Sequence, residues 1–175
     1  MEQIVQKSAQ RQKHPVNDLK LDTVKWLTEK YNIDLRNEDV QEMAAFLILW
    51  TLFEQKVLRA SEDISNEITR KAPSIKAEYK GLLEHINRWY ILNHPEQYIF
   101  NKFNFGGNLK SHVESYLKAE VKNEADEKIF VIGVIYKYRC NLFHGKKHLE
   151  SVARTQATRF QEFNHFLIEC LETKQ

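Results

Sequence analysis

The chain has 175 residues, of which 42% are apolar and 29% are charged, a composition that is typical of a globular protein and excludes a wholly disordered one. Its length fits a single domain that can bury a sizeable core without the help of a metal ion or a disulfide. The net charge of +2 excludes a histone-like polycation but is compatible with a local basic patch.

The sequence carries no pattern of a membrane or secretory segment. Its strongest apolar run, Met43 to Phe53, is much shorter than the roughly 20 residues that cross a bilayer, and the N-terminus has no apolar signal core. Cys140 and Cys170 fall in no CxxC pattern, so we expect free thiols in a cytoplasmic protein with no membrane association. No linker divides the chain, so we predict a mobile N-terminal arm over 1–15 and a single domain over 16–175.

The spacing of apolar residues predicts an all-α fold, a bundle of about six helices. Only five glycines and three prolines interrupt the chain, which favours long helices over a many-turned β architecture. Asn37 can cap a helix that should lie at the centre of the bundle, because Ala44 to Phe53 is almost uniformly apolar. Ser74 can cap a later helix. Besides a loosely patterned helix over 16–31, helices are predicted over 37–60, 62–71, 74–92, 108–123, 125–143 and 148–172.

Residues 93–107 form the only long stretch without helical periodicity, and we expect an ordered loop that packs over the core. Its aromatic side chains alternate with polar ones, so they can either seal the core or stack on nucleic-acid bases. The pair Gly106-Gly107 precedes Asn108, which can cap the next helix, and the pair is either a simple turn or a cradle for a phosphate. The alternating aromatic residues are Tyr98, Phe100, Phe103 and Phe105.

One segment near the end of the helix predicted over 125–143 carries the strongest chemical signal. From Tyr136 to Lys147 it reads Tyr-Lys-Tyr-Arg-Cys-Asn-Leu-Phe-His-Gly-Lys-Lys. Between Lys128 and Leu149 there is no Asp or Glu, against five Lys and Arg residues, so the segment creates a local positive field in a nearly neutral protein. Such a field attracts phosphate, and arginine offers a planar fork that matches phosphate oxygens.

Arg139 and His144 are the two residues of this segment best suited to chemistry. On a continuous helix their side chains diverge by roughly 140°. They can converge if Gly145 ends the helix and loosens its last turn, or they can converge between two copies across a dimer. A histidine near a helix end is otherwise only a solvated cation stabilised by the helix dipole.

Arg139-Cys-Asn-Leu-Phe-His144 resembles the Arg-x(4–6)-His motif of the HEPN superfamily. With the following Gly-Lys-Lys it is most similar to the branch whose motif reads Arg-Asn-Asn-Leu-Phe-His-Gly, as in Apea-like domains of prokaryotic defence proteins. The resemblance implies a metal-independent endoribonuclease without a cofactor, acting on RNA as a homodimer whose two motifs face one cleft. It also implies a toxin-like or antiphage defence effector, with an antitoxin or a defence-system protein as a further partner.

In that chemistry RNA supplies its own nucleophile, the 2′-hydroxyl, so the protein needs to provide only proton transfer and charge stabilisation. His144 would deprotonate this hydroxyl or protonate the departing 5′-oxygen, and Arg139 would hold the scissile phosphate. Asn141 can orient the phosphate or the histidine. The lysines expected to contact RNA phosphates are Lys137, Lys146 and Lys147.

Two positions depart from the family pattern. Cys140 stands where the family usually has a polar residue such as Asn, and a thiol is a poorer hydrogen-bond partner. This keeps open a non-catalytic HEPN-like dimeric module that binds nucleotide, RNA or a partner protein. Lys146 stands where one toxin branch has a tyrosine, so control by adenylylation is not implied. A third interpretation is a helical interaction domain whose basic segment is a solvated helix end.

Three further side chains leave alternatives open. Glu54 interrupts an apolar helix and either faces inward as a polar partner of Arg139 or lies on the solvent face. His144 and His148 could pair on a metal ion if they were helical, although no Glu or Cys nearby completes a ligand set, so no metal site is expected. Cys140 could act as a nucleophile beside His144 or simply pack at the helix end.

Overall fold

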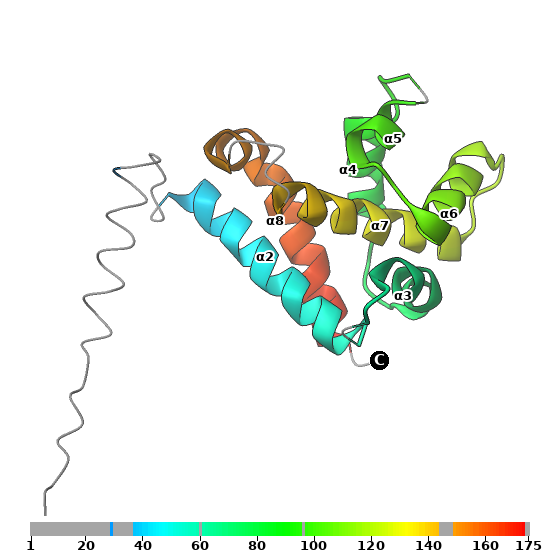
Figure 1. The fold of residues 1–175 in the computed structure, drawn as a ribbon, viewed down its shortest axis with the longest axis horizontal. Helices are drawn as coiled ribbons and strands as arrows, with labels where there is room; N and C mark the ends of the chain where they lie inside the picture. Colours follow the sequence, from blue (N-terminus) through cyan, green and yellow to red (C-terminus); the bar gives the residue numbers. More distant parts are fainter. Residues whose placement is uncertain (1–28, 30–36, 60, 96, 144–148, 174–175) are drawn as a thin grey trace, which may run out of the picture. The chain divides into compact units, whose positions relative to one another are not determined.

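The computed structural model describes Glu29 and residues 37–59, 61–95, 97–143 and 149–173, and within these the fold is all-helical, with seven α-helices, one short 3-10 helix and no strand. This confirms the predicted all-α bundle. The arm predicted over 1–15 lies outside the described residues, and so does the helix predicted over 16–31, apart from Glu29. None of the described helices is long and apolar enough to cross a membrane. The helices are α2 (Glu38–Lys56), α3 (Ile64–Lys71), η1 (Ala72–Ser74), α4 (Lys80–Tyr90), α5 (Tyr98–Phe103), α6 (Gly107–Lys118), α7 (Glu124–Phe143) and α8 (Leu149–Glu172), as Figure 1 shows.

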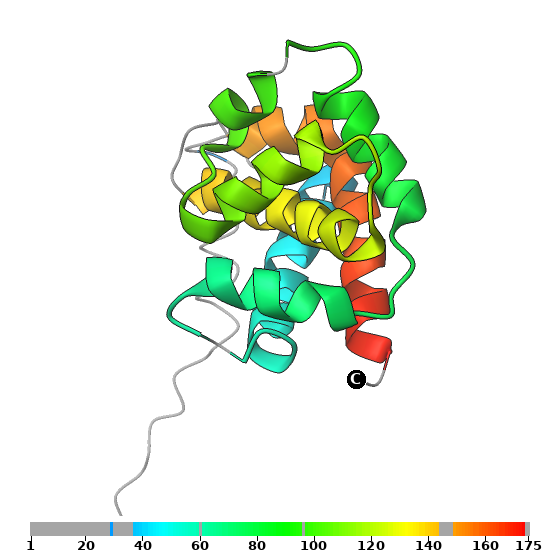
Figure 2. The same cartoon turned by 90° about the vertical axis from the view of Figure 1, so that its right-hand side faces the viewer.

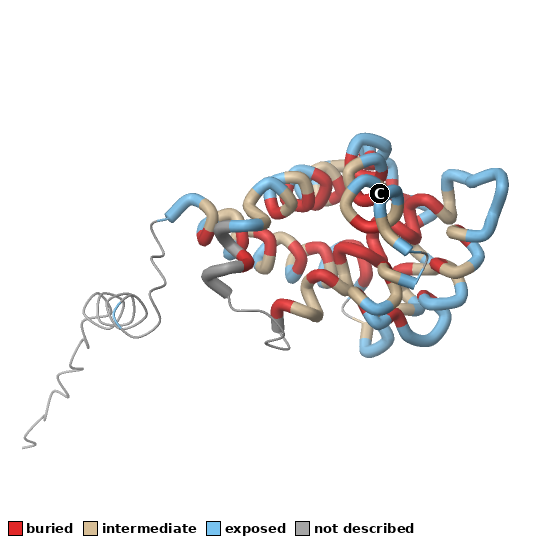
Figure 3. Tube along the Cα trace, turned by 90° about the horizontal axis from the view of Figure 1, so that it is seen from above, coloured by how far each residue is buried: buried red, intermediate tan, exposed pale blue. Residues whose placement is uncertain are grey.

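Helix α7 is the centre of the bundle formed by residues 36–175. It contacts α3, η1, α4, α5 and α6, and it passes between these helices and the pair formed by α2 and α8 (Figures 1 and 2). The buried positions gather on the sides of the helices that face one another (Figure 3). Tyr138 of α7 joins the two groups, because its ring centroid lies 6.4 Å from Phe103 of α5 and 5.2 Å from Phe163 of α8. Aromatic pairs in such geometries stabilise a core beyond their buried area.

Helix α2 begins as its sequence predicts. The side chain of Asn37 accepts a hydrogen bond of 2.8 Å from the backbone N–H of Asp39, which confirms the predicted N-cap. The helix is less central than expected, however. Its buried residues lie on one face, packed against α8 and α7, whereas Ile48 on the other face is 62% exposed.

The segment predicted as one helix over 74–92 is instead divided. After η1 the chain is not helical until α4 begins at Lys80, and Ile75, Ala77 and Tyr79 are buried while the residues between them are exposed. The burial therefore alternates with a period of two, but Ile75 and Tyr79 are also four residues apart, so the sequence pattern fits a helix as well. Ser74 does not cap α4; its hydroxyl donates to the carbonyl of Lys71 at 2.8 Å.

The stretch predicted as an ordered loop over 93–107 contains the short helix α5. The expectation that this stretch packs over the core is confirmed, because Ile99, Phe103 and Phe105 are buried. The next helix begins one residue before Asn108, with Gly106 as its N-cap, and the Asn108 amide donates to Asn66 at 2.6 Å. Asn108 therefore links α6 to α3 and is not the cap.

Candidate functional site

The candidate site occupies the last turns of α7, where continuous burial of that helix ends. From Glu127 to Ile135 every residue is buried. From Tyr136 to Leu142 only Tyr138 and Leu142 are buried, and the residues between and before them are half-buried. Asn123 starts the helix, since its side-chain oxygen accepts a 2.9 Å hydrogen bond from the backbone N–H of Asp126. The buried run anchors α7, so the polar residues that follow are held at a fixed place on the bundle.

Arg139 is held by Glu54, which comes from the far end of α2. A guanidinium nitrogen, Nη2, lies 3.6 Å from Oε2 of Glu54, and the two side chains are 29% and 16% exposed. Of the two alternatives for Glu54, the structure therefore shows the inward-facing partner of Arg139. The separation is longer than a hydrogen bond, so the pair is an ion pair that an incoming anion can displace.

Tyr136 packs beneath this pair, one helical turn before Arg139. Its ring stacks on Trp50 of α2, with centroids 5.9 Å apart and an interplanar angle of 28°. Burial raises the pKa of Tyr136 to about 12, and the neighbouring Cys140 thiol acts in the same direction. The phenol thus stays protonated at neutral pH and can donate a hydrogen bond but not accept a proton. The ammonium of Lys137 lies 5.3 Å from the Tyr136 ring centroid, a cation–π contact.

Asn141 ties the last turn of α7 to α5. Its side-chain amide donates to the backbone carbonyl of Lys102 at a distance of 3.1 Å. This contact holds the end of α7 against the aromatic segment. It also shows that at least one amide hydrogen of Asn141 is used for structure.

The remaining predicted residues of the motif, His144, Lys146 and Lys147, lie outside the described residues, as does His148. The convergence of His144 on Arg139 therefore stays a prediction, and so do the two alternatives that depend on it, the metal pair and the Cys140 nucleophile. Cys140 itself is a half-buried free thiol. Within the described residues, no group of three or more His, Cys, Asp or Glu side chains could hold a metal ion.

The aromatic segment contributes to the core more than to the surface. The Phe103 ring packs edge-on against Tyr90 at 4.8 Å and lies 5.8 Å from Phe105, so these two phenylalanines seal the bundle. Tyr98 and Phe100 are half-buried, and the Tyr98 ring stacks on His94 at 3.8 Å. Of the two alternatives for this segment, the structure shows core packing for Phe103 and Phe105.

The glycine pair makes a turn. Gly107 adopts a φ of 55°, in the left-handed region that favours glycine, and Gly106 is the N-cap of α6. A polar hollow of about 230 Å³ lies beside it, but Asp63 is one of its lining residues. A carboxylate opposes an anion, so the hollow does not have the character of a phosphate cradle.

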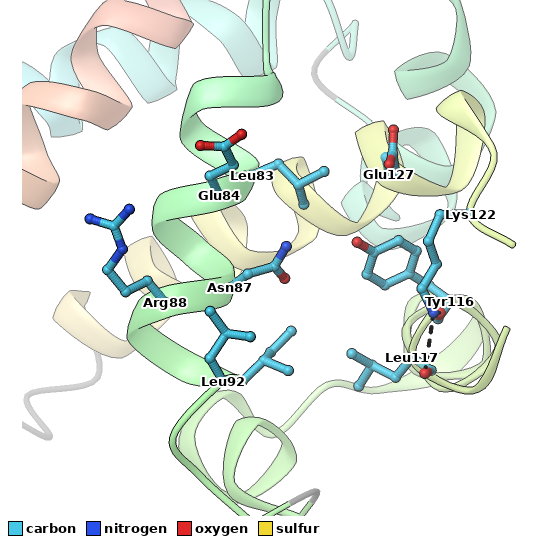
Figure 4. A pocket seen from close by; sticks show the side chains of 10 residues that line it. Leu83, Glu84, Asn87, Arg88, Leu92, Tyr116, Leu117, Lys122 and Glu127 are labelled. Carbon is cyan, nitrogen blue, oxygen red and sulfur yellow. Dashed lines mark hydrogen bonds between the residues drawn. The ribbon is translucent and has the colours of Figure 1, made fainter. Parts of the chain in front are cut away.

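A larger hollow of about 570 Å³ opens between α4, α6 and the start of α7 (Figure 4). Two of its charged lining residues, Lys122 and Glu127, already have partners within the protein. The ammonium of Lys122 donates to the carbonyls of Leu117 and Ala119, at 3.2 and 2.6 Å, and so caps the end of α6. Glu127 accepts a 2.7 Å hydrogen bond from the Tyr79 hydroxyl and another bond from Lys80. Lys122 and Glu127 therefore hold helices together, and the carboxylates of Glu84 and Glu127 offset the two basic residues of the hollow, Arg88 and Lys122.

Sequence reasoning missed three parts of the site, namely Trp50, Tyr136 and the carbonyl of Lys102. Tyr136 has a local signal, because it precedes Arg139 by one turn of the same helix. Trp50 lies within the apolar run from Ala44 to Phe53, which predicts only a core position, and a backbone carbonyl carries no signal in the sequence. Comparison with protein-family models, with curated proteins and with solved structures finds no match to this chain.

Proposed function

We propose that this protein is a metal-independent endoribonuclease of the HEPN type, acting in the cytoplasm as a toxin-like or antiphage defence effector. The observation that carries the proposal is the string Arg139-Cys-Asn-Leu-Phe-His144-Gly, whose first five residues end the central helix of an all-helical bundle. The half-buried, partly exposed state of Arg139 supports it, because a side chain that binds phosphate must be both positioned and accessible.

The proposed reaction needs no group beyond RNA and the protein. The 2′-hydroxyl of the substrate loses its proton to a histidine and attacks the adjacent phosphorus, and the bond from phosphorus to the 5′-oxygen breaks. A second proton transfer, from a histidine to this oxygen, completes the reaction and leaves a 2′,3′-cyclic phosphate and a 5′-hydroxyl. His144 performs both transfers, or one from each copy of a homodimer. Arg139 binds the phosphate oxygens, whose negative charge increases during the attack.

Glu54 and the lysines complete the site in this proposal. Glu54 holds the guanidinium in place until the phosphate arrives, and the phosphate then takes over part of this ion pairing. Lys137, Lys146 and Lys147 contact the phosphates on either side of the cleaved bond.

The test is cleavage of total RNA and of tRNA by the purified protein in excess EDTA. The variants are His144→Ala and Arg139→Ala, and Arg88→Ala on α4 is the matched control because it removes an exposed arginine that is not part of the motif. We expect cleavage by the wild type and by the control, with cyclic-phosphate ends, and its loss in both site variants. Cleavage that survives both substitutions would place the activity elsewhere.

The alternative is a non-catalytic HEPN-like dimeric module that binds nucleotide, RNA or a partner protein such as an antitoxin. One observation favours it: Arg139 is already paired with a carboxylate, and the thiol of Cys140 occupies the position that usually holds a polar side chain. If this alternative is correct, the folded protein binds RNA and leaves it intact, and Arg139→Ala weakens the binding.

A further inference from the structure

The side of α2 that faces away from the bundle is apolar along its central two turns. We call this surface the outer face of α2 and define it by Ala44, Ala45, Ile48, Thr51 and Leu52. Ile48 is 62% exposed, Ala44 and Thr51 are exposed, and Ala45 and Leu52 are half-buried. A helix that is apolar on both sides is normally covered on both, whereas α2 is covered only on the side that meets α8 and α7 within the described residues. The outer face therefore has the character of a contact surface.

The chemistry of this face suits a protein helix. The hydroxyl of Thr51 donates to the carbonyl of Leu47 at 2.8 Å, so this hydroxyl keeps a hydrogen-bond acceptor when a partner covers the face. The two alanines permit a close approach between helices. No Lys or Arg occurs between Glu38 and Gln55, so the face offers no cation to a nucleic-acid backbone.

The charges at the two ends of α2 indicate which helix covers it. The first turn is acidic and the last turn is basic, with Glu38 ten residues before Ile48 and Lys56 eight residues after it. At about 100° per residue, both side chains lie about 80° to the same side of Ile48. If a second α2 packs antiparallel across a two-fold axis near Ile48, Glu38 of each copy lies beside Lys56 of the other. The helix dipoles then also run in opposite directions, which is favourable.

We infer that the outer face of α2 binds the same face of a second copy of this chain, antiparallel, about a two-fold axis near Ile48. An isologous contact of this kind is the commonest way for a protein to form a dimer. The same helix carries Glu54, about 9 Å along its axis from Ile48 and about 120° around it, so the contact joins two Arg139 sites in one assembly without bringing them face to face. In this dimer each copy of the proposed ribonuclease keeps its own site, and the inference rests on α2 and not on cleavage.

The first test measures the oligomeric state of the full chain by analytical ultracentrifugation between about 1 and about 200 µM. The variants are Ile48→Asp and, as the matched control, Leu92→Asp, which alters an apolar side chain that is 71% exposed at the end of α4. We expect a dimer for the wild type and the control, and a rise in the dimer Kd of at least about thirtyfold for Ile48→Asp, because the change acts twice across the axis. Circular dichroism establishes that both variants are folded. A wild type that stays monomeric, or equal weakening by both variants, would overturn the inference.

The second test measures geometry by cysteine cross-linking in a Cys140→Ser background. Ile48→Cys should link to its own copy, because it lies on the axis. Glu38→Cys should not link to itself, since the two copies are about 30 Å apart, but it should link to Lys56→Cys in a mixture of the two variants. Self-linking by Glu38→Cys would show a parallel pair and contradict the inference. A dimer that forms as described and cuts no RNA would leave this inference standing and remove the proposed function.

Discussion

Replacement of Glu54 by glutamine should weaken the bundle by an amount set by its ion pair with Arg139. At 3.6 Å the pair is within Coulombic reach, but the side chains are 16% and 29% exposed and no direct hydrogen bond forms at that distance. Exposed pairs contribute about 0.2 to 1 kcal/mol, and fully buried ones lose several when one partner is removed. Partial burial puts the expected coupling energy between Glu54 and Arg139 at about 1 kcal/mol.

The measurement is a double-mutant cycle with the wild type, Glu54→Gln, Arg139→Gln and the double variant. Urea unfolding gives the free energy of each, and the cycle cancels the other contacts of Arg139. A coupling of about 1 kcal/mol corresponds to a shift of about 2 to 4 °C in Tm for a domain of this size. The coupling should decrease at high salt, because both side chains are partly solvated.

A coupling energy of zero at low salt would refute the reasoning that Glu54 positions Arg139. Should the protein cleave RNA, the same variant separates two roles for the carboxylate. If Glu54 positions the guanidinium, Glu54→Gln lowers kcat. If Glu54 competes with the substrate phosphate, Glu54→Gln lowers KM.

Three further predictions concern the stability of the bundle. Burial raises the pKa of Glu127, but Lys80 and the Tyr79 hydroxyl outweigh this effect and hold it below its ordinary value. The stabilisation by the ionised Glu127 is therefore present above about pH 4.5 and is lost as the pH falls through its lower pKa in the folded state. Glu127→Gln should lower the free energy of unfolding by about 1.5 to 3 kcal/mol at neutral pH and should flatten this acid dependence. Urea unfolding from about pH 3 to about pH 7 measures both effects. Phe46→Ala removes a fully buried ring from the contact between α2 and α8, so the free energy of unfolding should fall by about 3 to 5 kcal/mol, and a loss below 1.5 kcal/mol would contradict that packing. Lys122→Ala should cost about 1 kcal/mol and speed hydrogen exchange in the last turn of α6, which loses its cap.

The sequence predicts the long helices well because their signals are local and redundant. The helices predicted over 125–143 and 148–172 differ by one residue at their first positions from α7 and α8. In α7 the apolar run from Ile129 to Ile135, interrupted only by Gly133, predicts the helix, and the structure adds a cap at Asn123 that the sequence analysis did not use. In α2 the cap at Asn37 is likewise a contact between neighbours in the chain.

The elements that were missed depend on contacts between distant residues. Tyr79 is buried and its hydroxyl donates to Glu127 on α7, which stabilises the non-helical segment before α4 where the local pattern also fits a helix. Helix α5 is short, and its turns are stabilised by the rings of Phe103 and Tyr90 more than by helix propensity. Neither partner can be identified from the spacing of apolar residues.

The candidate site divides in the same way. The motif that contains Arg139 and Asn141 is contiguous, so its residues could be listed from the sequence. The partner of Asn141 is a carbonyl 39 residues away, and the partner of Arg139 lies on α2. The sequence left two alternatives for Glu54, inward toward Arg139 or outward to solvent, because a single acidic residue in an apolar helix does not reveal which way its side chain points.

The orientation of Arg139 follows from the core and not from the site. Tyr138 is 2% exposed and lies among the aromatic rings of α2 and α8, and Leu142, one turn later, is also buried. Successive residues on a helix differ by about 100°, so with Tyr138 fixed in the core Arg139 must point to the side of α7 where α2 ends. Glu54 stands at that place and pairs with the guanidinium. A substitution in the core that turns α7 about its axis would therefore move Arg139 away from Glu54 while leaving both charged residues unchanged. The aromatic core around Tyr138 thus helps to position the candidate site.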